Sequence, residues 1–201
     1  MELLAVIVIG LVIYLWHSHR KPRVSIAHLP QQFVIFDLET TGLDPSKHEI
    51  IEIGAIRVNR DSDTHDTFQA LIKPRKKIPK KITELTGITQ KMVDTDGQSL
   101  EATILDFIKF VGDLNLVAFN AEFDMAFLQR AAEAHSVSVE NPVSCALQMA
   151  RRAWPGRRSY KLAELAKDGN LRSDGTHRAL SDCQRALIVY TAAASRLGSI
   201  R

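Results

Sequence analysis

The chain has 201 residues, 45% of them hydrophobic, and a formal net charge of +3 at pH 7. Residues 1–16 carry −1 and residues 17–30 carry +3, which leaves +1 for residues 31–201. This length predicts one domain with a short appendage. A nearly neutral domain excludes a protein that holds duplex nucleic acid mainly by bulk positive charge.

The first thirty residues predict a membrane anchor followed by a linker. The run "LLAVIVIGLVIYLW" (Leu3–Trp16) is uninterrupted apolar sequence, about 21 Å long as a helix, against a hydrocarbon core of about 30 Å. Basic residues follow it, and positive charge marks the cytoplasmic side of a membrane. We therefore expect a single-pass membrane-anchor helix over residues 1–19, a basic linker over 20–31 and a cytoplasmic domain over 32–201. An export signal and a soluble helix remain as alternatives.

Strands dominate the start of the domain. We expect three of them, at residues 33–38, 50–58 and 64–74, with a hairpin turn between the second and the third. The first, "FVIFDL", is apolar on both faces, which is typical of a central strand. A fourth, short strand is expected at residues 115–119.

Helices are expected after the first three strands. A basic loop leads to a short helix around "KITELTG", and residues 99–112 show apolar residues at helical spacing between a Ser99 cap and a Gly112 stop. Strands first, and then strands alternating with helices, predict an α/β domain with a mixed sheet flanked by helices. The remaining helices are expected at 122–135, about 145–153, about 160–168 and about 178–197.

Two acidic residues, Asp37 and Glu39, end the first strand. Positions i and i+2 of a strand point to the same face, so the two carboxylates lie side by side and repel each other. A bound cation would offset that repulsion. The alternative is a strand end that has reached water, which is common for so short a motif.

Asp124, Asp182 and His177 are three further candidates. Both aspartates fall in the first turns of expected helices, where acids also serve simply to complement the helix dipole. His177 follows a loop rich in Gly, Ser and Asp, and taken alone it could be an ordinary loop histidine. None of the three is specific by itself.

Taken together, the segments that carry these residues are specific. In chain order they are "FDLETTGLDP", "AFNAEFD" and "HRALSD", with "IIEIGAIRV", "ITELTGIT" and "SYKLAEL" between them. The pattern resembles the DEDDh family of 3′–5′ exonucleases, relatives of the proofreading epsilon subunit of bacterial DNA polymerase III, over about residues 32–197. The resemblance implies a ribonuclease-H-like fold. Arg178 stands where another subgroup has tyrosine, so the histidine form is implied; Phe119 stands where relatives often carry histidine.

The resemblance also implies a site with two divalent cations, Mg²⁺ or Mn²⁺, which prefer hard oxygen ligands. It makes Asp37 the ligand that bridges both ions, and it assigns Glu39 and Asp182 to the ion that carries the attacking water. Asp124 then supports the leaving-group ion. His177 is implied as the general base, since histidine titrates near neutrality.

Residues beside the first two acids are candidates for binding the substrate. Thr40, Thr41 and Gly42 are expected to hold the terminal 3′ hydroxyl, and Leu43 and Phe123 are expected to pack on the last bases. The alternative is that "TTG" is only a turn.

Two runs of the chain are strongly basic. "KPRKKIPKK" (Lys73–Lys81) has six basic residues in nine, and "RRAWPGRRSYK" (Arg151–Lys161) has five in eleven. Solvated loop faces account for most such runs. The first could also guide a nucleic-acid strand, but the sequence does not show which face it occupies.

The preferred interpretation is a metal-dependent 3′–5′ exonuclease tethered to the cytoplasmic face of a membrane. It would act on 3′ ends of single-stranded nucleic acid, with DNA favoured, and release nucleoside 5′-monophosphates. The alternatives are a catalytically inactive tethered nucleic-acid-binding or adaptor module of the same fold, and an RNA-directed exoribonuclease. The sequence leaves a DNA polymerase or repair partner unproven and gives no oligomeric state.

Overall fold

The structure is a computed structural model, and it describes residues 29–168 and 177–199. The anchor helix predicted over residues 1–19, and most of the linker predicted over 20–31, lie outside these ranges. Within them, no helix combines the length and the apolar character that crossing a bilayer requires.

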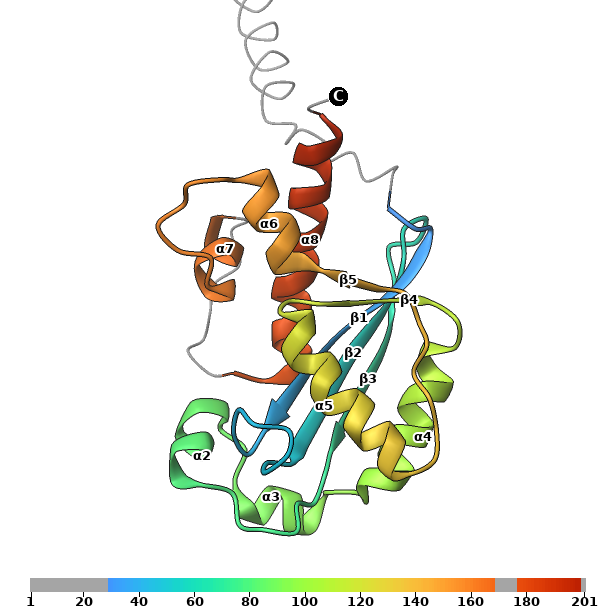
Figure 1. Ribbon diagram of the computed structural model, residues 1–201, viewed down its shortest axis with the longest axis vertical. Coiled ribbons are helices and arrows are strands. Elements are labelled where there is room, and N and C mark those ends of the chain that lie inside the picture. The colour runs from blue at the N-terminus through green and yellow to red at the C-terminus, as the bar shows by residue number, and fades with distance from the viewer. Residues whose placement is uncertain (1–28, 169–176, 200–201) are drawn as a thin grey trace, which may run out of the picture.

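A mixed five-stranded sheet lies at the centre of the domain, in the order β3-β2-β1-β4-β5 (Figure 1). β1 pairs antiparallel with β2 and parallel with β4, so it is the middle strand, as its apolar sequence predicted. β3 lies antiparallel on β2, and β5 lies parallel on β4. The strands are β1 (Gln32–Thr40), β2 (Ile50–Asn59), β3 (Asp66–Leu71), β4 (Asn115–Ala118) and β5 (Val143–Cys145).

Helices cover both faces of this sheet, which confirms the predicted α/β class. The helix expected at residues 99–112 is confirmed as α4, since the Ser99 side chain accepts a hydrogen bond from the Ala102 N–H and Gly112 caps the end with φ 56°. Two short elements, α3 and β5, were not predicted. The helices are α2 (Lys80–Thr86), α3 (Gln90–Thr95), α4 (Leu100–Val111), α5 (Ala121–Ala134), α6 (Ala146–Ala153), α7 (Leu162–Asp168) and α8 (Ala179–Gly198).

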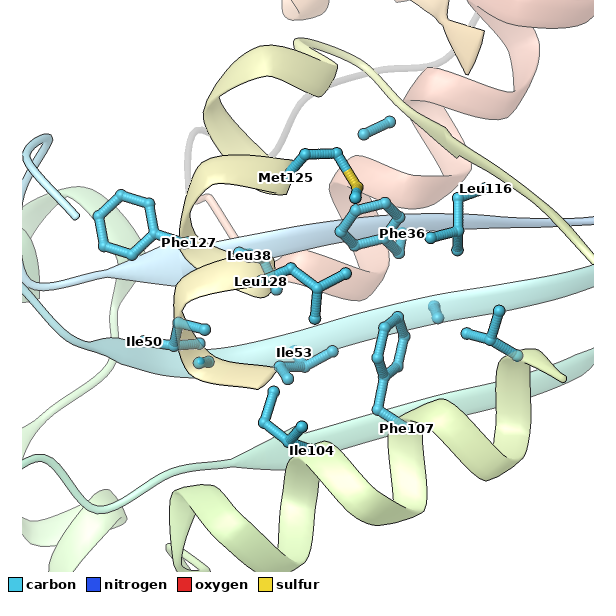
Figure 2. Packing of buried hydrophobic residues seen from close by; sticks show 14 of the residues in the cluster. Phe36, Leu38, Ile50, Ile53, Ile104, Phe107, Leu116, Met125, Phe127 and Leu128 are labelled. Atoms are coloured by element: carbon cyan, nitrogen blue, oxygen red, sulfur yellow. The ribbon is translucent and has the colours of Figure 1, made fainter. Parts of the chain in front are cut away.

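One face of β1 packs under α4 and α5. Phe36 is fully buried there, with its ring centroid 5.7 Å from that of Phe107 on α4. Figure 2 shows Met125 and Leu128 of α5 pointing toward Phe36 from the other side. This apolar layer fixes α5, and therefore the loop between β4 and α5, against the central strand.

The opposite face of β1 packs under α8. Phe33 and Ile35 lie in a core cluster with Cys183 and Tyr190 of α8, and the Phe33 and Tyr190 rings meet edge to face at 5.5 Å. Because side chains alternate along a strand, positions 37 and 39 point to this same face. The fold therefore aims the two acids of β1 toward the start of α8.

Candidate active site

Four acidic side chains converge where β1 ends. Asp37 and Glu39 come from β1, Asp124 from the first turn of α5, which follows the parallel neighbour β4, and Asp182 from the first turn of α8. The charges of Asp124, Glu39 and Asp182 all disfavour ionisation of the Asp37 carboxyl, in addition to the effect of its burial. The structure thus brings together the four acids that the sequence predicted.

Burial and mutual repulsion disfavour ionisation of this cluster. Burial, and then the neighbouring acids, hold the pKa of Asp37 well above its usual range. Burial and the charge of Asp182 raise the pKa of Glu39 to about 8. Burial raises the pKa of Asp124 to about 7, although the Leu38 backbone N–H donates to its carboxylate at 3.3 Å. Clustered carboxylate oxygens that resist ionisation without counter-charge fit hard divalent cations.

Asp182 and His177 form one hydrogen-bonded unit. Nδ1 of His177 lies 3.1 Å from Oδ2 of Asp182, and the His177 side chain is about half exposed while Asp182 is buried. Together with Glu39, these two residues place three ligand-type atoms within 4.8 Å of one another. The buried guanidinium of Arg185 donates to the other oxygen of Asp182 at 2.5 Å. Sequence reasoning missed Arg185, which sits one turn after Asp182.

A buried ion pair fastens the start of α8 to β2. Glu52 is fully buried and stands directly opposite Glu39 in the β1–β2 register. Arg178 donates to both carboxylate oxygens of Glu52, at 2.6 and 3.1 Å, and the Ala179 N–H donates to one of them at 3.0 Å. The Gln69 side-chain amide donates a further hydrogen bond to Glu52 at 2.9 Å. This pair, which we name the Glu52–Arg178 clamp, joins β2 to the residue that follows His177.

Gly54 lets the same helix approach the sheet closely. A Cβ at this position would lie 2.4 Å from the Leu180 backbone nitrogen, and the Cys183 thiol donates to the Gly54 carbonyl at 3.2 Å. Gly54 is also the β2 partner of Asp37. The backbone of α8 therefore rests directly on the strand pair that holds the first acid.

The loop after β1 is held by its own threonines. Thr40 donates its hydroxyl to the Gly42 carbonyl at 2.6 Å, and the Thr41 hydroxyl accepts from the Glu49 N–H at 3.0 Å. The imidazole of His48 fills the space where a Cβ on Gly42 would sit, which explains glycine there. The "TTG" segment is thus a built turn as well as a candidate binding loop.

The two predicted base-stacking residues differ in exposure. Leu43 is 83% exposed, which is unusual for so large an apolar side chain. Phe123 is partly buried, with its ring centroid 5.1 Å from that of Phe127 on the same helix. Both side chains stand beside the acid cluster in sequence, one after β1 and one just before Asp124.

A pocket of about 390 Å³ opens over the acids. Asp37, Glu39, Asp182 and His177 line it, whereas the buried Asp124 and the predicted substrate residues do not. Sequence reasoning named Lys161 only as part of a basic run, and the "SYKLAEL" segment that contains it was the available signal. The rest of the lining is Leu38, Phe119, Lys161, Leu162, Ala163 and Arg185.

Sequence comparison places relatives among bacterial replication proteins. The family model "RNase_T: Exonuclease" matches residues 34–190. DNA polymerase III subunit epsilon of Aquifex aeolicus is 36% identical over 151 residues, covering 75% of this chain and 74% of that protein. The PolC-type DNA polymerase III of Clostridium perfringens is 38% identical over 154 residues, 76% of this chain. The chain spans only about a tenth of that polymerase.

Structural comparison gives the same fold. Exonuclease X in complex with 5′ overhanging duplex DNA matches with a TM-score of 0.60 and 29% identity, over 79% of this chain and 90% of that one. E. coli Exonuclease I with a dT13 oligonucleotide matches with a TM-score of 0.74 and 18% identity, over 85% of this chain and 42% of that one, a likeness of fold alone. The α/β fold is therefore ribonuclease-H-like, and the chain belongs to the DEDDh 3′–5′ exonuclease family of phosphodiester hydrolases.

Proposed function

We propose that this protein removes nucleotides one at a time from the 3′ end of single-stranded DNA and releases nucleoside 5′-monophosphates. One observation carries the proposal: the four acids and His177, far apart in sequence, meet at the end of β1. An adaptor module of the same fold would have no use for the raised pKa values of Asp37, Glu39 and Asp124. The similarity to DNA polymerase III proteins favours DNA as the substrate.

The family uses divalent metal ions, and four residues fit them here: Asp37, Glu39, Asp124 and Asp182. When bound, two such ions acidify a water molecule and neutralise charge on the phosphate and the leaving oxygen. The charges of the other three acids all act on the Asp37 carboxyl, which suits a ligand shared by both ions. The metal assignment therefore follows the arrangement of the side chains as well as the resemblance.

His177 is positioned to move a proton. When its Nδ1–H donates to Asp182, the ring is held in the tautomer whose Nε2 accepts a proton. Nε2 then takes the proton of the attacking water, as a general base near neutral pH. The half exposure of this side chain lets the proton leave to solvent.

The turn after β1 is the proposed seat of the terminal nucleotide. Backbone and hydroxyl groups of Thr40, Thr41 and Gly42 would hold the 3′ hydroxyl, with Leu43 and Phe123 against the last bases. The large exposed apolar surface of Leu43 supports this, because a base would cover it. Such a site accepts an unpaired end, and a net charge of +1 over residues 31–201 gives little bulk attraction for a duplex.

The test compares degradation of 3′-labelled and 5′-labelled oligomers by wild type, Asp37→Asn and Asp106→Asn, with Mg²⁺ or Mn²⁺. Asp106 is an exposed acid on α4 and serves as the matched control. Matched single-stranded DNA, single-stranded RNA and 5′-overhanging duplex DNA are the substrates. We expect Asp37→Asn alone to lose activity and single-stranded DNA to be cut fastest. Faster cleavage of RNA would make the protein an exoribonuclease, and equal results for wild type and Asp37→Asn would favour the adaptor.

We also propose that the domain is attached to the cytoplasmic face of a membrane through residues 1–19. The apolar run Leu3–Trp16 and the basic residues after it support this. Carbonate-washed membranes should retain the full chain and should lose a chain that begins at Ser25. Recovery of the full chain in the wash would exclude the anchor.

A further inference from the structure

The basic segment, Lys73–Lys81, is an ordered part of the surface. Ile78 of this segment is partly buried against Ile51 and Ile88, and its N–H donates to the Gln90 side chain at 3.0 Å. The basic side chains lie on both sides of Ile78 along the chain and are exposed. The segment is therefore fixed by its apolar residue while its charges face solvent.

One end of the basic segment is bound to the proposed substrate loop. The carboxylate of Glu49 accepts from the Arg75 N–H at 3.2 Å, from Nε of Arg75 at 3.0 Å and from the Lys76 N–H at 3.2 Å. Glu49 in turn exchanges two hydrogen bonds with Thr41, at 2.9 and 3.0 Å. Only Glu49 separates the backbone of Lys76 from Thr41.

The other end of the basic segment leads to His177. Lys80 and Lys81 begin α2, and at the end of that helix the Leu85 carbonyl accepts from the His177 N–H at 3.1 Å. Figure 1 shows α2 beside the end of β1 and the start of α8. The basic segment therefore runs along the rim of the site, from the substrate loop to the catalytic histidine.

Three of its charges have no ion-pair partner among the residues that the structure describes. Lys73, Arg75 and Lys80 form ion pairs with Asp94, Glu49 and Glu84 respectively. Across residues 29–168 and 177–199, no carboxylate lies in ion-pair distance of Lys76, Lys77 or Lys81. A hollow of about 840 Å³ beside the start of the segment has mixed charge, because it also contains glutamates. The net positive potential at this rim therefore comes from these three lysines.

We propose that Lys76, Lys77 and Lys81 bind the phosphates of the nucleotides upstream of the 3′ end. This inference rests on the proposed function and deepens it. The acid cluster repels an approaching polyanion, and cations at the rim offset that repulsion where the strand must enter. The partner is the sugar–phosphate backbone of single-stranded DNA, contacted without regard to base sequence.

The experiment compares Lys76→Gln/Lys77→Gln with Arg151→Gln/Arg152→Gln in the full chain. The second pair removes the same charge from the end of α6, where Ala153 accepts from Arg196. Arg196 lies about 21 Å along α8 from Asp182, at 1.5 Å per residue, so the control is remote from the site. Both pairs are exposed. KM and kcat are measured on a 20-nucleotide single strand at several salt concentrations.

For the lysine variant we expect KM to rise roughly tenfold at 0.1 M salt with kcat within about twofold of wild type. The slope of log(kcat/KM) against log salt should fall in magnitude by about 1.4, or 0.7 for each lost phosphate contact on a single strand. On a trinucleotide, the lysine variant and wild type should have equal KM. The arginine variant should match wild type throughout.

Equal slopes for wild type and the lysine variant overturn the proposal, as does an equal loss in the arginine variant. The proposal is also overturned if KM of the lysine variant rises as much on the trinucleotide as on the 20-nucleotide strand, because upstream phosphates would then be irrelevant. Failure of the proposed function is distinct: wild type itself would be inactive, or Asp37→Asn would match it.

Discussion

His177 is held at three points although half of its side chain faces solvent. Nδ1 bonds to Asp182, the backbone N–H bonds to the Leu85 carbonyl, and the next residue is Arg178 of the Glu52–Arg178 clamp. The neighbours therefore fix the ring position without burying the ring. A general base needs this combination, because it must reach water and still be aligned.

Replacing His177 by alanine should slow catalysis without removing the metal site. We expect kcat to fall by about 10²–10⁴-fold, the usual contribution of a general base, while Mn²⁺ affinity measured by calorimetry changes by less than about threefold, since the four carboxylates remain. His65→Ala, an exposed histidine between β2 and β3, is the control. An unchanged kcat would remove the role, and lost Mn²⁺ binding would make His177 a ligand.

At the scale of elements, the position of α8 decides the site, because α8 carries Asp182 and is preceded by His177. Two contacts with β2 set that position: the close approach at Gly54 and the Glu52–Arg178 clamp. They are specific in different ways. The contact at Gly54 is steric and needs the absence of a side chain; the clamp is ionic and needs a buried carboxylate with a partly buried guanidinium.

Gly54→Ala should displace α8. The added Cβ would meet backbone atoms of α8 at 2.4–2.5 Å, and backbone cannot move aside as a side chain can. We expect the free energy of unfolding to fall by about 1–3 kcal/mol and kcat to fall more than tenfold. Gly112→Ala is the control, since it strains a positive φ at the opposite end of the sheet with open space around it. Retained kcat in Gly54→Ala would show that the site tolerates a shifted α8.

A double-mutant cycle on Glu52→Gln and Arg178→Gln measures the clamp. Because Glu52 is fully buried and Arg178 is two-thirds buried, we expect a coupling free energy of about 1–3 kcal/mol from urea unfolding. The exposed pair Lys80–Glu84 gives the comparison, and its coupling should stay below about 0.5 kcal/mol. If the coupling free energy of the clamp is as small as that of the Lys80–Glu84 pair, the ionic interaction between Glu52 and Arg178 does not stabilise the fold.

The sequence predicted those elements whose signals are long or local. Capping residues placed α4 to within one residue, and the apolar run "FVIF" identified the central strand. α3 has six residues and β5 has three, and such short segments do not show a hydrophobic period. β5 is defined by its parallel pairing with β4, which the sequence of β5 does not reveal. Glu52 was missed, although an acid inside the apolar strand "IIEIGAIRV" signals a buried cationic partner.

For the whole molecule, the convergence of the acids was predictable through the family resemblance, whereas their electrostatics required the fold. The sequence alone shows that Asp37 and Glu39 share a face. That Asp124 and Asp182 meet them depends on β4 pairing parallel with β1 and on α8 crossing the opposite face. Burial by those elements raises the pKa values of Asp37, Glu39 and Asp124, and that burial links the site to the stability of the protein.

Metal removal should therefore make the stability of the protein depend on pH. In the unfolded chain Glu39 has its ordinary pKa near 4.5, and in the folded protein about 8; Asp124 changes from near 3.8 to about 7. Between these values the folded protein holds protons that the unfolded chain has lost. A rise in pH through this window therefore lowers the free energy of unfolding, and the loss is complete above about pH 8, where both groups are ionised in the folded protein as well.

With a chelator present, we expect Tm to fall by at least about 3 °C between pH 6 and pH 8, where roughly 2–4 °C corresponds to 1 kcal/mol for a domain of this size. Mg²⁺ should reduce the fall, because cations bind the ionised carboxylates of the folded state. Glu39→Gln should be more stable than wild type at pH 8 without metal, whereas Glu140→Gln, an exposed site, should match wild type. A chelated wild type whose Tm rises or stays constant over this range would show that the acids are not forced together by the fold.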